Sequence, residues 1–210
     1  MMPKLLTALL LALLPGMCSG GTDAAAEPPV PVVQVENRDG IVVLDLRYRV
    51  PVSPAEAWDV LTDFENMPAF IPNLDSSRVL LRNGSLIHLE QKGRLRLGML
   101  PIPYESTRQL ETVPYRSIRA HSLSGNTRME SLMLLTRDVE GTLISYHLTA
   151  EPDLPVPAGL VSSYISGMLE SQFKAMGREM MRRAQSRGLG RNDAADGTTE
   201  RADGKVKQGT

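Results

Sequence analysis

The chain has 210 residues, and its 23 Lys and Arg nearly balance its 24 Asp and Glu. This length holds one domain with extensions or two small domains, and the near-zero net charge excludes a nucleic-acid-binding protein that relies on bulk basicity. Aromatic residues make up only 4%, whereas Met occurs 11 times, so we expect an aliphatic core with few rigid rings. A single Cys and three dispersed His exclude an internal disulfide framework and a Cys-based zinc site, and we expect neither a metal nor a cofactor.

Residues 1–26 have the pattern of a secretory signal with its processing region. One Lys precedes about ten mostly apolar residues, whereas a helix that spans a bilayer needs about 20. Pro15 and Gly16 then end the apolar run. A charge, a short apolar run and small residues in this order predict export, so we expect a periplasmic or secreted protein. Cleavage after Gly20 and cleavage after Ala26 both remain open.

Cys18 offers an alternative to conventional cleavage, because a lone Cys just after the apolar run is typical of a lipid-anchored bacterial lipoprotein. That processing favours a small residue directly before the Cys, and Met17 is large. We therefore predict conventional cleavage, with lipid anchoring at Cys18 as the alternative.

Composition divides the remaining chain into three parts. Residues 27–40 begin with a Pro-rich stretch and are expected to form an extended linker. Residues 41–186 form the expected folded domain, and a domain of about 150 residues buries about two-thirds of its unfolded surface. Residues 187–210 have no apolar period, so we expect a disordered tail.

A strand followed by a helix opens the folded domain. Ile41–Val50 alternates apolar and polar residues from Val42 onward, which predicts a half-buried strand. Ser53 can cap a helix, Pro54 suits its first position, and Glu56 completes a capping box.

Prolines and turn residues then divide the chain into short elements. Pro68 and Pro72 limit the next segment to one or two short helical turns. Asn83-Gly84 predicts a two-residue hairpin turn, and Gly93 is one of several residues that separate the later strands. The predicted strands are residues 77–82, 85–92, 94–100, 104–112, 116–123, 128–138 and 142–150.

The apolar period changes after these strands, and residues 158–186 are predicted to form one long helix. Its apolar residues recur at intervals of three and four, which makes a single stripe. Consecutive strands with short turns predict an antiparallel meander with one covered face. The helix is therefore expected to lie across that face, in an α+β domain.

The segment 50–72 carries a family resemblance: a strand ends before S-P-x-E-x-W, T-D-F follows at the helix end, and P-x-F-x-P comes next. It resembles the opening of START-like proteins, the SRPBCC superfamily, which includes polyketide cyclases and coenzyme Q-binding proteins, and the order of elements matches over about residues 41–185. The resemblance implies a helix-grip fold (START/Bet v 1-like). In that fold a curved antiparallel β-sheet of about seven strands wraps on a long C-terminal helix around an apolar cavity, with two short helices after the first strand. This fold hosts carriers, receptors and enzymes alike.

Few residues suggest catalysis. His88, His121 and His147 all fall on predicted strands without the spacing of metal ligands, and no GxGxxG, P-loop or GxSxG motif is present. Arg108 shares a strand face with apolar residues. It is expected to be a paired or snorkelling arginine, and the alternative is a clamp for the head group of a ligand.

The methionines allow two interpretations. Met129, Met133 and Met168 are among those assigned to inward faces, where they either fill an ordinary core or line a deformable cavity. The predicted cavity-lining ligand contacts are Leu97, Met99, Arg108, Met133, Tyr146, Tyr164, Met168 and Phe173, with Phe64 and Phe70 as the gate.

Together these features predict an exported binding or carrier protein for an apolar ligand: a lipid, an isoprenoid quinone or a polycyclic molecule. Its expected partners are that small molecule and, transiently, a membrane, but no nucleic acid. The alternative is an aromatase/cyclase-type enzyme that uses the same cavity, which requires convergent acid and base groups that no sequence pattern supplies. A third interpretation, an interaction module at a membrane surface, requires an exposed apolar patch that the sequence does not reveal.

Overall fold

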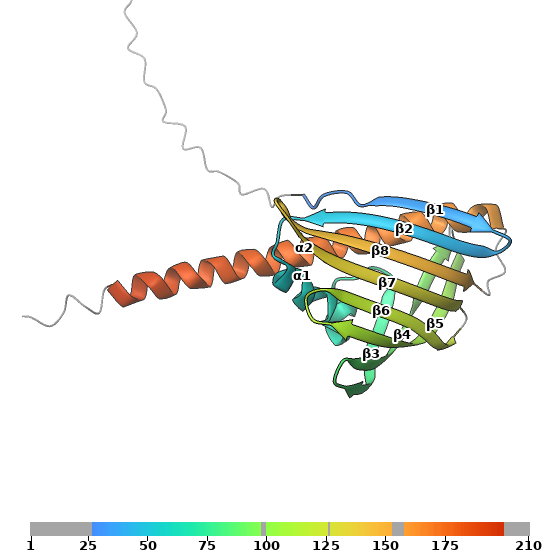
Figure 1. Ribbon diagram of the computed structural model, residues 1–210, viewed down its shortest axis with the longest axis horizontal. Helices are drawn as coiled ribbons and strands as arrows, with labels where there is room; N and C mark the ends of the chain where they lie inside the picture. The colour runs from blue at the N-terminus through green and yellow to red at the C-terminus, as the bar shows by residue number, and fades with distance from the viewer. Residues whose placement is uncertain (1–26, 98–99, 126, 153–157, 200–210) are drawn as a thin grey trace, which may run out of the picture.

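The computed structural model describes residues 27–97, 100–125, 127–152 and 158–199, which form one sheet, two short helices and one long helix (Figure 1). The eight-stranded sheet is antiparallel, in the order β1-β2-β8-β7-β6-β5-β4-β3. Its strands are β1 (Val32–Arg38), β2 (Ile41–Val50), β3 (Leu74–Asn83), β4 (Leu86–Leu97), β5 (Leu100–Val113), β6 (Ser117–Gly125), β7 (Thr127–Asp138) and β8 (Gly141–Pro152). The helices are α1 (Pro54–Leu61), the 3₁₀-helix η1 (Phe64–Ala69) and α2 (Ala158–Thr199). The predicted helix-grip architecture is confirmed, with eight strands in place of about seven.

The capping box of α1 is present. The Ser53 backbone N–H donates to Glu56 Oε2 at 2.8 Å, and the Glu56 backbone N–H donates to Ser53 Oγ at 3.3 Å. These two bonds satisfy donors that a helix N-terminus otherwise leaves free. They fix the point where the chain leaves β2 and crosses toward α2.

The core lies between the inner face of the sheet and α2. The alternation of β2 puts Val42, Leu44, Leu46, Tyr48 and Val50 on that face, each at most 1% exposed. The apolar stripe of α2 packs against the same core, and Figure 1 shows α2 running behind the sheet and projecting beyond it.

β1 lies within the predicted linker and is a paired strand instead. Val33 and Val35 alternate with exposed residues and pack against the core, and the strand pairs with β2 across a tight turn. Asp39 and Gly40 have φ of 53° and 87° in that turn, which suits a two-residue hairpin. The Pro-rich start of the segment concealed the short alternation that follows it.

Two predicted strand boundaries also shift. β4 runs through Gly93 without a turn. Glycine is needed at this position because a side chain there would overlap the carbonyl oxygen of Asn73 and the ring of Tyr104. Gly93 therefore serves a close approach inside a strand and does not end one. The hairpin predicted at Asn83-Gly84 is present, and its two-residue loop is residues 84–85.

α2 starts where predicted but continues to Thr199, so residues 187–199 of the expected disordered tail are helical. Once a helix is nucleated, each added residue costs little, and Arg187 Nη2 pairs with Asp59 Oδ2 of α1 at 2.7 Å. Residues 200–210 and the expected signal segment 1–26 lie outside the described residues. Among the helices that are described, none is long and apolar enough to cross a membrane.

Candidate functional site

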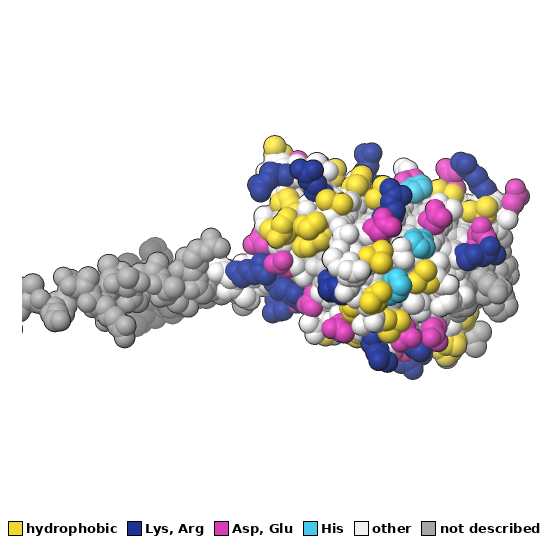
Figure 2. Space-filling view, turned by 60° about the horizontal axis from the view of Figure 1, so that its bottom comes forward, with side chains coloured by type: hydrophobic (Ala, Val, Ile, Leu, Met, Phe, Trp, Pro, Cys, Tyr) yellow, Lys and Arg dark blue, Asp and Glu magenta, His cyan; other side chains and the backbone are white. Residues whose placement is uncertain are grey.

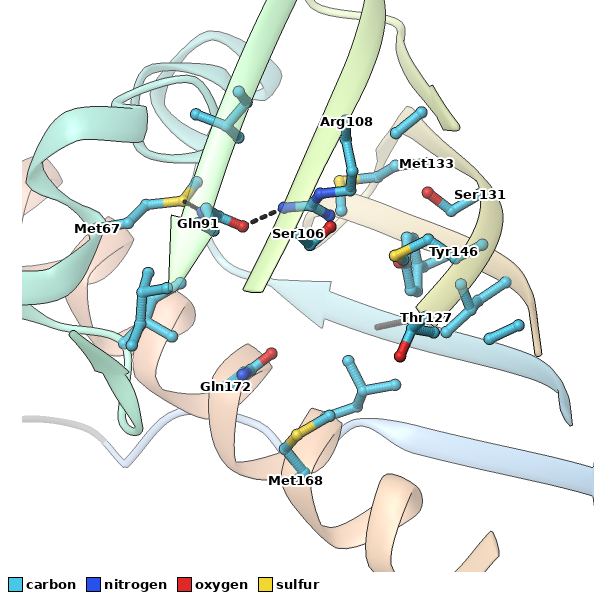
Figure 3. A pocket seen from close by; sticks show the side chains of 18 of the residues that line it. Met67, Gln91, Ser106, Arg108, Thr127, Ser131, Met133, Tyr146, Met168 and Gln172 are labelled. Atoms are coloured by element: carbon cyan, nitrogen blue, oxygen red, sulfur yellow. Dashed lines mark hydrogen bonds between the residues drawn. The ribbon is translucent and has the colours of Figure 1, made fainter. Parts of the chain in front are cut away.

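A cavity of about 290 Å³ lies between the inner face of the sheet and α2. Its wall comes from strands β3 to β8, from the α1–η1 segment and from α2. Most of the wall is aliphatic or aromatic, with a few polar groups set into it (Figure 3). This composition is typical of a site that removes an apolar molecule from water and orients it by a small number of polar contacts.

Strand alternation decides which side chains reach the cavity. Tyr104, Ser106, Arg108 and Leu110 are spaced by two along β5, and all four line the wall. The same period places Met129, Ser131 and Met133 of β7 on the wall. Alternate residues of a strand share one face, so one strand supplies both apolar surface and hydrogen-bonding groups.

The structure brings most of the predicted site residues together. Those on the cavity wall are Phe64, Arg108, Met133, Tyr146, Tyr164, Met168 and Phe173. The side chain of Leu97 and the whole of Met99 lie outside the described residues. That the wall residues contact a ligand stays a prediction.

Phe70, the second residue of the predicted gate, does not line the cavity as Phe64 does. It is half-buried against the core, and the guanidinium of Arg183 lies 5.8 Å from its ring centre. Within the described part of the chain it is not a cavity-lining residue. Its neighbours Met67 and Ile71 line the cavity instead.

The methionines divide between the two expected roles. Met129, Met133, Met168 and Met176 line the cavity, which fits the deformable-wall interpretation. Met180 is completely buried in the core beyond it.

Arg108 is held by a neutral partner. Its Nη2 donates to Gln91 Oε1, and Gln91 Nε2 in turn donates to Ser77 Oγ at 3.1 Å and approaches Met67 Sδ at 3.5 Å (Figure 3). Burial lowers the pKa of the Arg108 guanidinium, while the hydroxyls of two nearby tyrosines act in the opposite direction. No carboxylate among the described side chains forms an ion pair with it.

Two buried polar atoms of this wall have no hydrogen-bond partner: Arg108 Nε and Ser106 Oγ. The phenols beside them are protonated at neutral pH. Burial raises the pKa of Tyr146, and a hydrogen bond with Ser131 and the charge of Arg108 only partly offset this. Burial likewise raises the pKa of Tyr104. The site can donate hydrogen bonds to a ligand oxygen, but its described wall holds no carboxylate or imidazole for proton transfer.

Sequence reasoning did not identify Gln91, Ser106 and Ser131 as site residues. Each interrupts an inward-facing apolar alternation, as Gln91 does after Ile87 and Leu89. A polar residue at an inward position of a strand is the signal that could have found them.

The histidines lie outside the cavity. His88 Nε2 lies 3.2 Å from Gln109 Oε1, and His147 Nδ1 lies 2.9 Å from Asp45 Oδ1. Figure 2 shows the histidines on a surface that also carries acidic and basic side chains. Across the described residues, no cluster of His, Cys, Asp and Glu could hold a metal ion.

A sequence profile of the family described as "Polyketide cyclase / dehydrase and lipid transport" matches residues 50–176, more than half of the chain. No curated protein sequence is similar enough to count as a match.

Solved structures show the same fold at low sequence identity. A STAR-related lipid transfer protein from Xanthomonas axonopodis aligns with a TM-score of 0.61 and 15% identity, over 75% of this chain and 97% of that one. The Zhui aromatase/cyclase from Streptomyces sp. R1128 aligns with a TM-score of 0.54 and 12% identity, over 70% and 95%. Human STARD10 aligns with a TM-score of 0.55 and 13% identity, over 75% and 76%.

Proposed function

Since the chain belongs to the polyketide cyclase/dehydrase and lipid transport family of the START-like superfamily, we propose that it is an exported carrier for one apolar molecule. The observation that carries this proposal is the cavity of about 290 Å³ with its largely apolar wall. Ligand pockets generally measure about 300–1,000 Å³. A cavity at the low end of this range favours a single-chain lipid or a compact polycyclic molecule over a lipid with two long chains.

The energetic cost of leaving this cavity empty favours the proposal that a ligand occupies it. At roughly 24 cal/mol per Å³, a dry void of this size costs on the order of 7 kcal/mol. The whole net stability of a domain is only about 5–15 kcal/mol. A ligand that fills the space removes this penalty, and the flexible methionines of the wall let the free protein collapse around part of it.

Export is the second part of the proposal, and the pattern of residues 1–26 supports it. N-terminal sequencing of protein recovered from the periplasm or medium should begin after Gly20 or after Ala26. An intact Met1, or an acylated Cys18, contradicts conventional cleavage. Transient membrane contact stays a prediction for the loading and release of the ligand.

The carrier role is tested by Met168→Glu. Met168 lines the cavity from α2, so a carboxylate there meets an apolar space and either becomes neutral or displaces the helix. We expect the affinity for a fluorescent lipid or quinone analogue to fall at least tenfold, about 1.4 kcal/mol. Ser171→Glu is the matched control, because Ser171 is exposed on the same helix.

Equal binding by Met168→Glu and the parent, with the fold intact by circular dichroism, contradicts this placement of the site. Mass spectrometry of molecules that copurify with the exported protein gives an independent identification of the ligand.

One observation favours the alternative, an aromatase/cyclase-type enzyme: Arg108, Ser106 and Tyr146 converge on the same cavity. They could polarise a carbonyl and stabilise an enolate. The two functions differ in what a single polar substitution does. For an enzyme, Ser106→Ala abolishes turnover of a polyketide substrate while binding persists, whereas a carrier has no turnover to lose.

A further inference from the structure

The cavity has a net positive charge. Among the described residues of its wall, Arg108 is the one side chain that is ionised at neutral pH, because the wall includes no Asp, Glu, Lys or His. A guanidinium keeps its proton at any physiological pH. The phenols of Tyr104 and Tyr146 stay neutral because burial raises their pKa values. The described wall thus contains a cation without a counter-ion.

The hydrogen bonding of this cation is incomplete as well. Gln91 accepts from Nη2, but an amide oxygen is a dipole and does not neutralise the charge. Ser77 fixes the amide by accepting from its nitrogen, which leaves the amide oxygen to face Arg108. Arg108 Nε and Ser106 Oγ remain buried without partners. These two donor groups lie two residues apart on one face of β5, at the cavity wall (Figure 3).

A buried charge and buried donors without partners are both strongly unfavourable. The planar guanidinium matches the two oxygens of a carboxylate or phosphate, and such charge-assisted bonds are the strongest that it makes. We propose that the ligand is an amphiphile with one oxyanion group, a carboxylate or a phosphate monoester. This group pairs with the guanidinium of Arg108 while the apolar body fills the rest of the cavity. The inference rests on the proposed carrier function and narrows its ligand class.

A neutral ligand fits this site less well. An isoprenoid quinone or a hydrocarbon excludes the remaining water from Arg108 without supplying a charge in return. A site with buried hydrogen-bonding groups rejects a molecule that leaves them unpaired far more strongly than an apolar pocket discriminates by size. The charge of the head group, rather than the length of the chain, is therefore expected to dominate selectivity.

The test compares three probes of one chain length: dodecanoate, its methyl ester and dodecyl phosphate. Their dissociation constants are measured at pH 7.5 by titration calorimetry, below the concentrations at which they aggregate. We expect at least one of the two anions to bind the parent protein at least tenfold more tightly than the ester. The tighter of the two anions identifies the head group as carboxylate or phosphate.

Arg108→Met removes the charge and leaves a shorter, flexible apolar side chain. We expect it to lose the preference for anions while its affinity for the methyl ester stays within about threefold. Arg119→Met is the matched control, since Arg119 is exposed on β6 and lies outside the cavity. It should retain the full preference, which excludes a general effect of protein charge.

Each result has a distinct meaning. If the ester binds the parent as tightly as both anions, the cavity is an apolar-ligand site as proposed and the inference about charge is wrong. A preference for anions that survives in Arg108→Met also overturns the inference, because the charge then resides elsewhere. If no probe binds a protein with native circular dichroism, the carrier function itself fails.

Discussion

Tyr48 and Gly177 are packed so closely that neither can change independently. The Tyr48 ring meets Phe173 edge-on with centroids 6.1 Å apart. Its hydroxyl is buried without a hydrogen-bond partner, and burial raises its pKa to about 12. A side chain at Gly177 of α2 would overlap that hydroxyl. The glycine therefore provides space for a tyrosine on the facing strand.

This contact predicts that Gly177→Ala destabilises the protein. Alanine favours a helix by about 1 kcal/mol over glycine, but overpacking a core generally costs about 1–3 kcal/mol. We expect the free energy of unfolding, measured with urea, to fall by up to about 2 kcal/mol, the difference between these two effects. In a Tyr48→Phe background the loss should be smaller, because the overlapping oxygen is gone. An equal loss in both backgrounds shows that the hydroxyl is not the obstacle.

Between elements, Arg183 links α2 to the two residues that flank η1, Asp63 and Phe70. Its Nη2 lies 2.7 Å from Asp63 Oδ2, directly before η1, and its Nε lies 2.6 Å from Glu179 Oε1 on α2. The guanidinium also covers Phe70. These contacts hold Phe70 against α2, and the gate role of Phe64 and Phe70 stays a prediction.

We predict that Arg183→Met speeds ligand release. The partly buried pair is stronger than a typical surface ion pair, so its loss should free η1 to open. Stopped-flow displacement of a fluorescent ligand should show koff raised about fivefold, which corresponds to about 1 kcal/mol. Arg182→Met is the control, because Arg182 pairs with Glu179 on its own helix. If both variants release ligand at the parental rate, the opening of η1 does not limit exchange.

For the whole molecule, ligand binding should raise the free energy of unfolding and therefore Tm. A ligand that binds only the folded state adds about 2.7 kcal/mol at 100 times its dissociation constant. For a domain of this size each kcal/mol raises Tm by about 2–4 °C, so a shift of about 5–10 °C is expected in a thermal melt. Met168→Glu should lose most of this shift at the same ligand concentration. A ligand that binds tightly without raising Tm would bind the unfolded chain equally well.

The sequence specified the elements whose signals are local. β2 could be read from its alternation and α1 from its capping box, because each depends on residues within one short segment. The continuity of β4 through Gly93 and the end of α2 depend on partners far away in the chain, so local patterns did not show them. β1 pairs with the strand that follows it, and its short alternation was hidden by the prolines before it.

The candidate site follows the same division. Alternation along β5 placed Arg108 on an apolar face, but the sequence could not show that its partner is the amide of Gln91 on β4. That pairing depends on the register between two strands. The absence of a carboxylate around the guanidinium, among the described side chains, likewise becomes visible only when the walls are assembled.

The inner face of β2 contributes no residue to the cavity in the described part of the chain; it forms solid core with Met180 and Gly177 of α2. Positions 164–176 of α2 thus include its cavity-lining residues, whereas Gly177 and Met180, which follow directly, pack in the core. Substitutions that reshape the cavity wall leave this packed core intact. Such a chain can therefore acquire new ligands through a series of single substitutions, each of which gives a folded protein. A directed-evolution library confined to the β5, β7 and early α2 wall positions should yield far more folded variants than one of equal size confined to β2.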